Sequence, residues 1–406
     1  PRVPCLPIGA REALLLLDGL RVVPAAGTEE RPTRLGPGPV EVELAVDAPR
    51  ELRTIRNVIA TLAGQDEKLV IAGNHRDAWV RGANDAGSGT VAMMRAAQHL
   101  GERARAGWKP RHTLILGFWD AEEFGLIGST EWGEANAERL RRDALAYVNA
   151  DTAVGGTSFN ASGSPGLLHG LLAVLDQLPG AGGKTTLGAE WRASFKDKPP
   201  KLDLPGSGSD FAVFLHHLAV PVIDFGFGGN GGGQYHTHFD DFPLVERYLD
   251  PGFVGHELAG NFVAQLLGTW ADRDDGGFDD VEAARAMAEM VRAAGRETPG
   301  DKAWLGPERA EKIAAELDGY AQAVEASAGV QGPRLYAALA EEGGIAGRPW
   351  YRNPLWAPGL ETGYSAETLP NLRAAAKRGE GFLELELQRL ASRVAAAAAR
   401  WKKPGQ

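Results

Sequence analysis

Short apolar segments alternate with segments of helical periodicity through the first two thirds of the chain, and this alternation limits the fold more than any other feature. Apolar runs of strand length lie at residues 68–73, 112–119, 145–149 and 220–227. A helical pattern lies at residues 88–100, and further helical segments separate the later runs. Because strands that alternate with helices form a largely parallel sheet covered on both faces, we predict an α/β fold with a mostly parallel central sheet and flanking helices.

The composition divides the chain into three segments. Residues 1–40 are rich in Pro and Gly and carry one short helical pattern at residues 10–20, so this segment is too small to bury a core of its own. Apolar residues alternate at residues 40–46 and 54–62, which predicts strands at the start of the second segment, residues 41–271. After residue 271 Ala, Glu and Arg dominate with helical periodicity, so we predict a mostly helical domain at residues 272–406.

Charge and cysteine content exclude several classes of function. The chain carries 53 acidic and 43 basic residues, a formal net charge of −10, so it has no basic excess with which to bind the phosphates of a nucleic acid. Cys5 is the only cysteine, which rules out an internal disulfide and a thiolate metal site. No run approaches the roughly 20 apolar residues that cross a bilayer. A metal in this chain must therefore be held by His, Asp and Glu.

Polar clusters follow the predicted strands directly. His75 follows the first apolar run of this set, the acidic residues at 120–123 follow the second, and Asp151 follows the third. The carboxyl ends of parallel strands are where open α/β sheets place their ligand sites. Imidazole and carboxylate groups are zinc ligands, and two zinc ions need one carboxylate that bridges them. The candidates for such a centre are His75, Asp85, Glu122, Glu123, Asp151 and His236.

Each candidate taken alone also has an ordinary structural explanation. A single loop histidine is most often solvated, the Glu122–Glu123 pair could complement a helix dipole, and Asp151 could cap a turn. The six positions lie on separate strand ends, however, and a parallel sheet brings such ends to one edge. We therefore favour a shared site over six unrelated structural roles.

The candidates lie within local motifs that carry a family resemblance. In chain order these motifs read NHRDAW at residues 74–79, NDAGSG at 84–89, WDAEEFGLIGSTEW at 119–132, YVNAD at 147–151, GSGSDF at 206–211 and YHTH at 235–238. Their order and spacing resemble the glutamate carboxypeptidase II and transferrin receptor-like family of two-zinc exopeptidases. The resemblance covers nearly the whole chain, weakly at residues 1–40 and, beyond residue 272, mainly at residues 348–352 and 364–370.

The resemblance implies a ligand for each position of a two-zinc centre. His75 and Asp151 would hold one zinc ion, Glu123 and His236 would hold the other, and Asp85 would bridge the two. The residues alone leave His236 and His238 equally placed, and the Tyr-His order of the family favours His236. The resemblance also implies a cis peptide bond between Asp85 and the next residue.

Further roles follow from the same resemblance. Glu122 would be the general base that takes a proton from a hydroxide or water bridging the metals. Tyr235 would stabilise the developing oxyanion, and Asp77 would be the carboxylate that fixes the tautomer of His75. Contacts with the substrate are expected from Ser207, Gly208, Ser209 and Tyr364.

Some polar residues receive no catalytic role. His216 and His217 lie on a helical stretch with large apolar neighbours, which predicts packing or a solvated face. Glu131 and Glu134 match positions that contribute to a structural calcium site in the resembled carboxypeptidase. The other calcium ligands would precede Pro1, so that site would be incomplete in this chain. A serine hydrolase is not favoured, because the serines at 207 and 209 lack the G-x-S-x-G elbow.

The expected activity is that of a zinc-dependent, carboxypeptidase-like exopeptidase acting on small peptides. Two alternatives are an aminopeptidase of the same superfamily, which would need an acidic pocket for the free amine, and a non-catalytic receptor-like dimer. Gly363 stands where the resembled carboxypeptidase has a lysine that holds a substrate carboxylate, and residues 224–233 contain no basic residue. We therefore expect neutral or apolar peptides to be cleaved better than acidic ones.

The resemblance also implies the chain's assembly and compartment. Residues 1–40 resemble only the trailing part of a protease-associated (apical) domain, including residues 6–9. The C-terminal region resembles a dimerisation domain, and its Ala-rich helix at residues 381–401 is apolar around most of its circumference near residues 394–399. A homodimer is therefore expected. The family is mostly extracytoplasmic and the chain begins with Pro1, so we expect an extracytoplasmic or secreted protein.

Overall fold

The computed structural model describes residues 8–18, 21–28, 31–35, 41–47, 51–297, 304–327, 332 and 334–401. The chain divides into two compact units, Pro1–Thr54 and Ile55–Gln406. The first contains helix α1 (Ala10–Asp18), where a helix is predicted, and strands β1 (Arg21–Thr28) and β2 (Arg31–Leu35), which pair antiparallel. The apical-domain resemblance includes residues 6 and 7, which lie outside the described residues.

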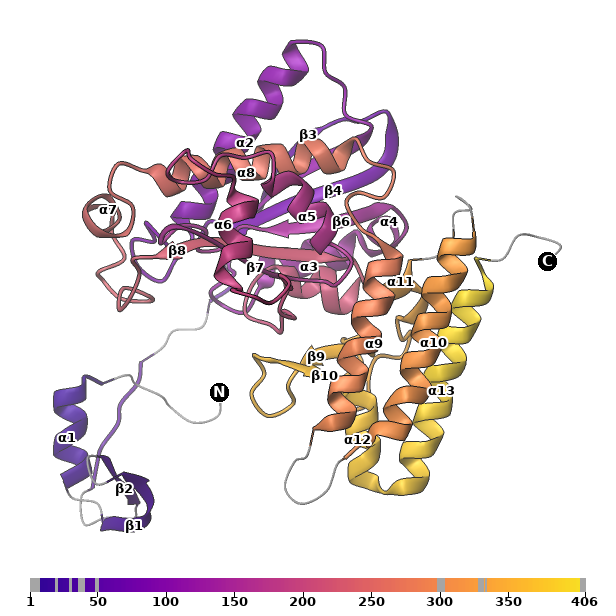
Figure 1. Cartoon of the computed structure of the whole chain (residues 1–406). Helices are drawn as coiled ribbons and strands as arrows, with labels where there is room; N and C mark the ends of the chain where they lie inside the picture. Colours follow the sequence, from indigo (N-terminus) through magenta and orange to yellow (C-terminus); the bar gives the residue numbers. More distant parts are fainter. Residues whose placement is uncertain are drawn as a thin grey trace. The chain divides into compact units, whose positions relative to one another are not determined.

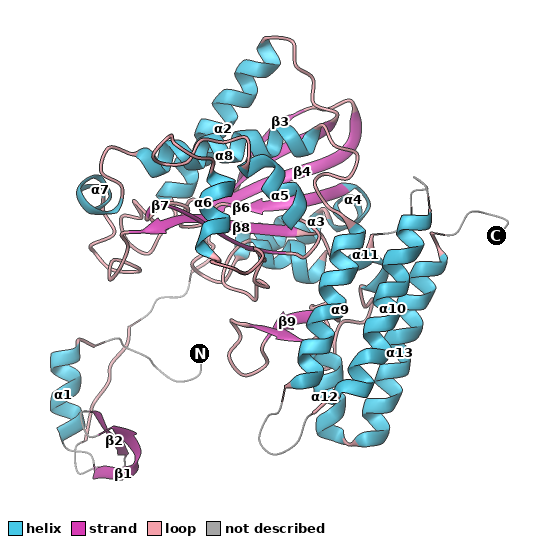
Figure 2. Ribbon diagram, viewed as in Figure 1, coloured by secondary structure: helices cyan, strands magenta, loops and turns pink. Residues whose placement is uncertain are grey.

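The second unit is built on a six-stranded sheet (Figures 1 and 2). Its strands, in spatial order, are β3 (Val58–Leu62), β5 (His112–Trp119), β4 (Asp66–His75), β6 (Ala144–Asn149), β8 (Val222–Gly229) and β7 (Gly156–Gly163). The four central strands run parallel, and the two edge strands β3 and β7 run antiparallel to their neighbours. The predicted mostly parallel sheet is confirmed. The pattern of apolar runs does not predict that the two edge strands run antiparallel.

One strand prediction is wrong. Residues 41–47 belong to no strand, although their apolar residues alternate as in a strand, and the first strand of the sheet begins at Val58. Alternation shows that a segment would present an apolar and a polar face if extended. A strand also needs a neighbour to accept and donate its main-chain hydrogen bonds, and the alternation of one segment carries no information about that neighbour.

Helices cover both faces of the sheet. On one face α2 (Gly87–Arg105) and α8 (Val254–Ala271) lie side by side, and Phe262 of α8 packs against Phe225 and Phe227 of β8. On the other face, Phe214 stacks on Tyr147 of β6 with ring centroids 3.8 Å apart. The shorter helices of this unit are α3 (Ile127–Ala135), α4 (Ala137–Asp143), α5 (Leu168–Leu175), α6 (Leu187–Ser194), α7 (Phe242–Leu244) and the π-helical turns η1 (Val213–His217) and η2 (Val245–Leu249).

The region after residue 272 is mostly helical, as the composition predicts. Its elements are α9 (Asp280–Arg296), α10 (Pro307–Ala326), α11 (Leu335–Leu339), β9 (Trp356–Pro358), β10 (Ala366–Thr368), α12 (Pro370–Arg378) and α13 (Glu380–Ala399). Helix α10 packs between α9 and α13 (Figure 1). No helix among the described residues is both long enough and apolar enough to span a bilayer.

A loop of this helical region contacts the segment at residues 206–207 of the sheet-containing region. It joins β9 to β10 and carries Tyr364, whose main-chain oxygen accepts a hydrogen bond from the Ser207 N–H at 2.8 Å. A Cβ added at Gly206 would come within 1.8 Å of that same oxygen, so only glycine permits this close approach. The C-terminal region thereby contributes directly to the surroundings of the strand ends.

Candidate metal centre

The ends of the parallel strands bring the predicted ligands together. Strand β4 ends at His75, and Asp151 lies two residues beyond the end of β6. Asp85 lies at the start of α2, and this helix lies close to the strand ends because it begins with small residues. A Cβ on Gly89 would lie 1.7 Å from the oxygen of Ala150. The peptide bond between Asp85 and Ala86 is cis, which confirms the prediction.

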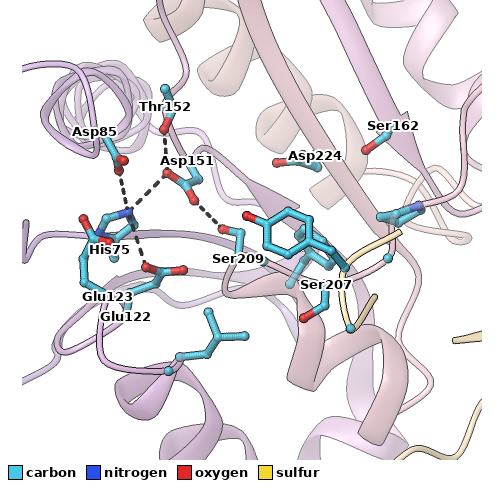
Figure 3. Close-up of a pocket in the computed structure, with 18 of the residues that line it drawn as sticks. His75, Asp85, Glu122, Glu123, Asp151, Thr152, Ser162, Ser207, Ser209 and Asp224 are labelled. Carbon is cyan, nitrogen blue, oxygen red and sulfur yellow. Dashed lines mark hydrogen bonds and ion pairs between the residues drawn. The ribbon is translucent and has the colours of Figure 1, made fainter. Parts of the chain in front are cut away.

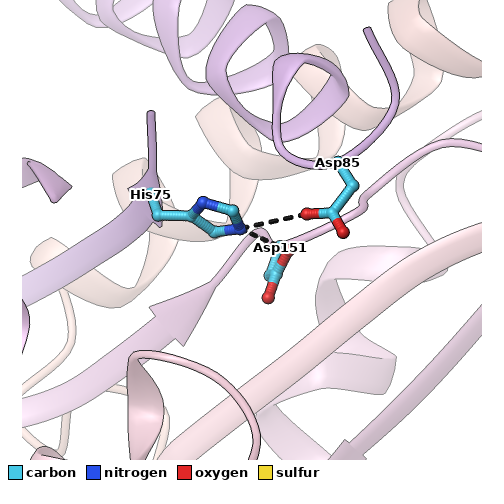
Figure 4. A group of neighbouring side chains, drawn as sticks. All are labelled: His75, Asp85 and Asp151. Atoms are coloured by element: carbon cyan, nitrogen blue, oxygen red, sulfur yellow. Dashed lines mark hydrogen bonds and ion pairs between the residues drawn. The ribbon is translucent and has the colours of Figure 1, made fainter. Parts of the chain in front are cut away.

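Two groups of side chains among the described residues are arranged so that each could hold a metal ion. The first is His75, Asp85 and Asp151, and the second is Asp85, Glu123 and His236. In the first group His75 Nε2 lies 3.1 Å from Asp85 Oδ1 and 3.2 Å from Asp151 Oδ1 (Figure 4). In the second, His236 Nε2 lies 3.2 Å from Asp85 Oδ2 and 3.3 Å from Glu123 Oε2.

Asp85 belongs to both groups and offers a different oxygen to each. Its Oδ1 faces His75 and its Oδ2 faces His236. A carboxylate in this position can bind one cation through each oxygen, which is the arrangement that a pair of metal ions needs. Each group also supplies one imidazole and one further carboxylate, a donor set that suits zinc and leaves positions open. The residues therefore fit two zinc ions.

Glu122 lies beside this centre and joins neither group. Its Oε2 is 3.9 Å from His75 Nε2. Burial raises the pKa of Glu122 to about 9; the imidazole of His75 opposes the rise, and the carboxylates of Asp210, Asp151 and Glu123 add to it. A bound divalent cation would lower this pKa, because positive charge favours the carboxylate. Glu122 thus occupies the place expected of a general base, next to the ligands and not among them.

Asp77 organises the turn that carries the two glutamates. Its carboxylate accepts hydrogen bonds from the main-chain N–H groups of Glu122 at 3.0 Å and of Glu123 at 3.3 Å. His75 Nδ1 lies 2.9 Å from the main-chain oxygen of Asp77 and 3.6 Å from its carboxylate. The Asp77 carbonyl is therefore the closer partner of Nδ1, and the Asp77 carboxylate, predicted to fix the imidazole tautomer, lies next to it. Either way Nδ1 is the donor and Nε2 is left for a metal.

A network of polar side chains holds Asp151. The Ser209 hydroxyl donates to Asp151 Oδ2 at 2.7 Å, and the Thr152 hydroxyl donates to Asp151 Oδ1 at 3.0 Å. Asn149 in turn donates to Ser209 Oγ at 2.8 Å. Burial acts to raise the pKa of Asp151, but its contacts with His75, Ser209 and Thr152 outweigh burial and lower it. Ser209, predicted to contact substrate, contacts a candidate ligand in this structure.

Sequence reasoning missed Asp240. This buried residue accepts hydrogen bonds from the main-chain N–H groups of Asn84 at 2.7 Å and Asp85 at 3.0 Å, so it fixes the loop that carries the shared carboxylate. The one feature of the sequence that could have indicated this role is the position of Asp240 in the same polar run as His236. The role of Asn149 was also missed, although this residue lies in the YVNAD motif. Nothing in the sequence distinguishes a strand asparagine that supports a candidate ligand two positions later from any other strand residue.

The centre opens into a cavity of about 1060 Å³ (Figure 3). Five acidic side chains line it, and no Lys or Arg does so among the described residues. Carboxylates gathered in this way repel one another and bound cations would relieve that repulsion, which supports a metal centre independently of the ligand geometry. The cavity is also lined by the predicted residues Tyr235, Ser207, Gly208, Ser209 and Tyr364.

Tyr235 and Tyr364 stand at the rim of this cavity. Both rings are more than half exposed. Tyr235 stacks on His236 with ring centroids 3.7 Å apart. Burial and the neighbouring Tyr364 raise the pKa of Tyr235, so its hydroxyl stays protonated and can donate a hydrogen bond to an oxyanion.

The remaining histidines and glutamates lie apart from the metal groups. His238 is exposed and belongs to neither group, in agreement with the choice of His236. His216 is fully buried, where it contacts the Gly206 oxygen and burial lowers its pKa to about 4. His217 stacks on Trp350. Both histidines therefore have packing roles.

Neither metal group includes Glu131 or Glu134, and Glu134 instead accepts a hydrogen bond from Trp350 Nε1 at 2.6 Å.

Comparison with known proteins matches two parts of the chain to family models. Residues 57–249 match peptidase family M28, and residues 334–402 match the transferrin receptor-like dimerisation domain. The probable glutamate carboxypeptidase LAMP1 of Arabidopsis thaliana is 33% identical over 92% of this chain and 56% of its own length. The aminopeptidase NAALADL1 of Mus musculus is 34% identical over 66% of this chain and 40% of its own length.

This chain thus spans about half the length, or less, of these curated relatives. Among solved structures, a zinc aminopeptidase from Bacillus subtilis is similar over 52% of this chain and 48% of its own, with a TM-score of 0.38 and 18% identity.

Proposed function

Since the chain belongs to the glutamate carboxypeptidase II and transferrin receptor-like family, with an M28 peptidase region and a dimerisation domain, we propose that it is a two-zinc exopeptidase that hydrolyses short peptides. The single observation that carries this proposal is Asp85, which presents one oxygen to each of two histidine-and-carboxylate groups. The first zinc ion would be held by His75, Asp85 and Asp151, and the second by Asp85, Glu123 and His236.

The residues of the chain divide the chemistry among them. Zinc, when bound, would polarise the scissile carbonyl and acidify a water molecule. Glu122 accepts the proton of the attacking water and delivers it to the leaving amine, because it lies next to the ligands without being one. Tyr235 donates a hydrogen bond to the oxyanion from the rim of the cavity. Ser207, Gly208 and Tyr364 contact the substrate.

The experiment that tests this function combines metal analysis with two neighbouring variants. Purified protein supplied with zinc should contain two zinc ions per chain. Glu122→Gln should keep both ions and lose about 100- to 10,000-fold in turnover, because a general base contributes that much. Glu123→Gln, the matched control, should lose zinc as well as activity. A protein that binds no zinc, or a Glu122→Gln variant that loses it, would contradict the assignment.

The substrate preference of the proposed enzyme follows from the lack of Lys and Arg among the described residues that line its cavity. Gly363 supplies no charge, and neither Lys nor Arg lines the cavity among the described residues. The cavity therefore favours neutral or apolar substrates over acidic ones, whose extra carboxylates would meet five acidic side chains and neither Lys nor Arg. A panel of dipeptides varied at both positions tests this expectation; higher kcat/KM for acidic residues on both sides of the bond would overturn it.

The dimerisation domain supports a homodimer. Helix α13 exposes Phe382 and Leu385 on the side away from its buried residues, and apolar side chains of this size are what a protein interface covers. Light scattering at micromolar concentration should give twice the mass of one chain. A monomer under those conditions would exclude the homodimer.

A further inference from the structure

The metal-centre cavity contains one more carboxyl group than the proposed reaction uses. Three of its five acidic side chains are proposed zinc ligands and a fourth, Glu122, is the proposed base. The fifth is Asp224, which has no part in that chemistry. Figure 3 shows it with Ser162 on the opposite side of the cavity from His75 and Asp85.

The strand that carries Asp224 directs it to the cavity. Asp224 is the third residue of β8, and side chains of a strand alternate between its two faces. Phe225 and Phe227 point to the face covered by α8. Asp224, Gly226 and Gly228 therefore share the other face, where the two glycines leave space.

Asp224 is tied to the metal centre by two hydrogen-bonded side chains. Asn149 donates to Asp224 Oδ1 at 2.9 Å and to Ser209 Oγ, whose hydroxyl donates to Asp151. The second oxygen of Asp224 has no hydrogen-bond partner among the described residues and is available to a ligand. Burial raises the pKa of Asp224 to about 7, so the charged carboxylate lacks the cation that would stabilise it.

The charged end of an exopeptidase substrate must lie close to the metals. In an aminopeptidase substrate a single Cα atom separates the α-ammonium group from the scissile carbonyl carbon, so the group that binds the ammonium has to stand beside the ligands. A carboxypeptidase substrate instead places a carboxylate on the leaving-amine side of the scissile bond, also close to the metals, and needs a cationic or donor-rich partner there. The cavity offers a carboxylate and, among the described residues, neither Lys nor Arg.

We propose that Asp224 binds the free α-ammonium group of the substrate's first residue, and that the chain is an aminopeptidase for peptides with unblocked N-termini. This inference rests on the proposed two-zinc exopeptidase function and specifies which end of the peptide it acts on. A recess of about 370 Å³ adjoins Asp151 and Asp224 and is lined by Asn160 and several glycines of the β8 segment. It provides room for an uncharged first side chain.

Binding and turnover test the inference separately. Binding is measured by calorimetry on the zinc-loaded Glu122→Gln protein, which does not consume the peptide, with the dipeptide Leu-Ala and its N-acetyl derivative. Leu-Ala should bind about 10- to 100-fold more tightly, as expected for one hydrogen-bonded ion pair in a partly buried site. Adding Asp224→Asn should remove most of that difference by weakening Leu-Ala and leaving the acetylated peptide unchanged. Asp203→Asn, an exposed aspartate paired with Lys201, is the matched control.

The outcomes separate the two proposals. If the acetylated peptide binds as well as Leu-Ala, or if Asp224→Asn weakens both equally, Asp224 does not recognise the amine and the inference is wrong. In the Glu122-containing enzyme, Asp224→Asn should raise KM for Leu-Ala and change kcat little. Zinc-loaded enzyme that hydrolyses only the acetylated peptide overturns the amino-end inference and leaves the exopeptidase intact. Enzyme that hydrolyses neither peptide, while still binding Leu-Ala through Asp224, overturns the proposed function and the aminopeptidase activity that rests on it, and leaves the recognition of the amine by Asp224 intact.

Discussion

The two halves of the candidate metal centre are held in different ways. On the inner side His75 is 1% exposed, and its partner Asp151 receives hydrogen bonds from Ser209 and Thr152. On the outer side the His236 side chain is 36% exposed and lies under the ring of Tyr235. Glu123 receives one main-chain hydrogen bond, from Trp79 N–H at 3.3 Å.

This difference suggests a division of labour between the two halves. Ligands that are buried and hydrogen-bonded hold their geometry before a metal arrives, and such support raises the affinity of a site. His236, which lies at the open rim, can admit solvent and substrate. We expect the inner half to bind zinc more tightly and the outer half to exchange it more readily.

The largest expected effect comes from removing what the halves share. Asp85→Ala should eliminate zinc from both halves and lower activity by about 1,000-fold or more, because the proposed bridging carboxylate would be a ligand in each group. Metal content by mass spectrometry and kcat/KM on a peptide substrate measure this. Asp197→Ala, an exposed aspartate elsewhere in the same unit, should change neither. Retention of one full equivalent of zinc by Asp85→Ala would show that the halves do not depend on a common ligand.

A smaller effect should distinguish the two histidines. His75→Ala removes the buried imidazole that contacts both Asp151 and Asp85, so in metal-free protein the free energy of unfolding should fall by about 1–3 kcal/mol. His236→Ala exposes its neighbours to water and should lower that free energy by less than about 1 kcal/mol. Chemical denaturation of both variants measures the difference. Equal losses would mean that burial does not distinguish the halves.

The candidate ligands of both halves are predicted from sequence, because each motif is local and the ends of parallel strands meet at one edge. His75, Asp85 and Asp151 follow from that geometry together with the family motifs. Asp240 could not be predicted, since it bonds to main-chain N–H groups of a loop far earlier in the chain and no periodicity links the two. Ser209 is predicted to contact substrate because the sequence shows a serine in a glycine-containing loop but not the direction of its hydroxyl.

The fold, like the candidate site, was predictable where a local sequence pattern determines it. The central strands are continuous apolar runs and were located to within a few residues, whereas the antiparallel pairing of β3 and β7 depends on chain direction, which an apolar run does not encode. Residues 41–47 alternate as a strand would and form none. Local pattern thus predicts which residues are buried, and pairing has to be observed.

The smallest effect concerns the support of the inner half by a single hydroxyl. Ser209 Oγ donates to Asp151 Oδ2 and accepts from Asn149, so Ser209→Ala leaves the ligand in place and removes one hydrogen bond that orients it. Loss of a hydrogen-bond partner that orients a metal ligand weakens metal binding by about 10- to 100-fold. Ser207→Ala is the matched control, because Ser207 lies in the same loop and cavity but contacts Tyr364 through its main chain.

Competition with a chelator should therefore show that one of the two zinc ions of Ser209→Ala binds about ten times more weakly than in the parent protein. The affinity for the other ion should be unchanged, and Ser207→Ala should bind both ions as the parent protein does. The weakened ion should be the tighter of the parent's two, because Ser209 supports only the inner half. If the weaker ion were the one affected, the inner half would not be the high-affinity site, and burial of His75 would have to serve folding instead of metal binding.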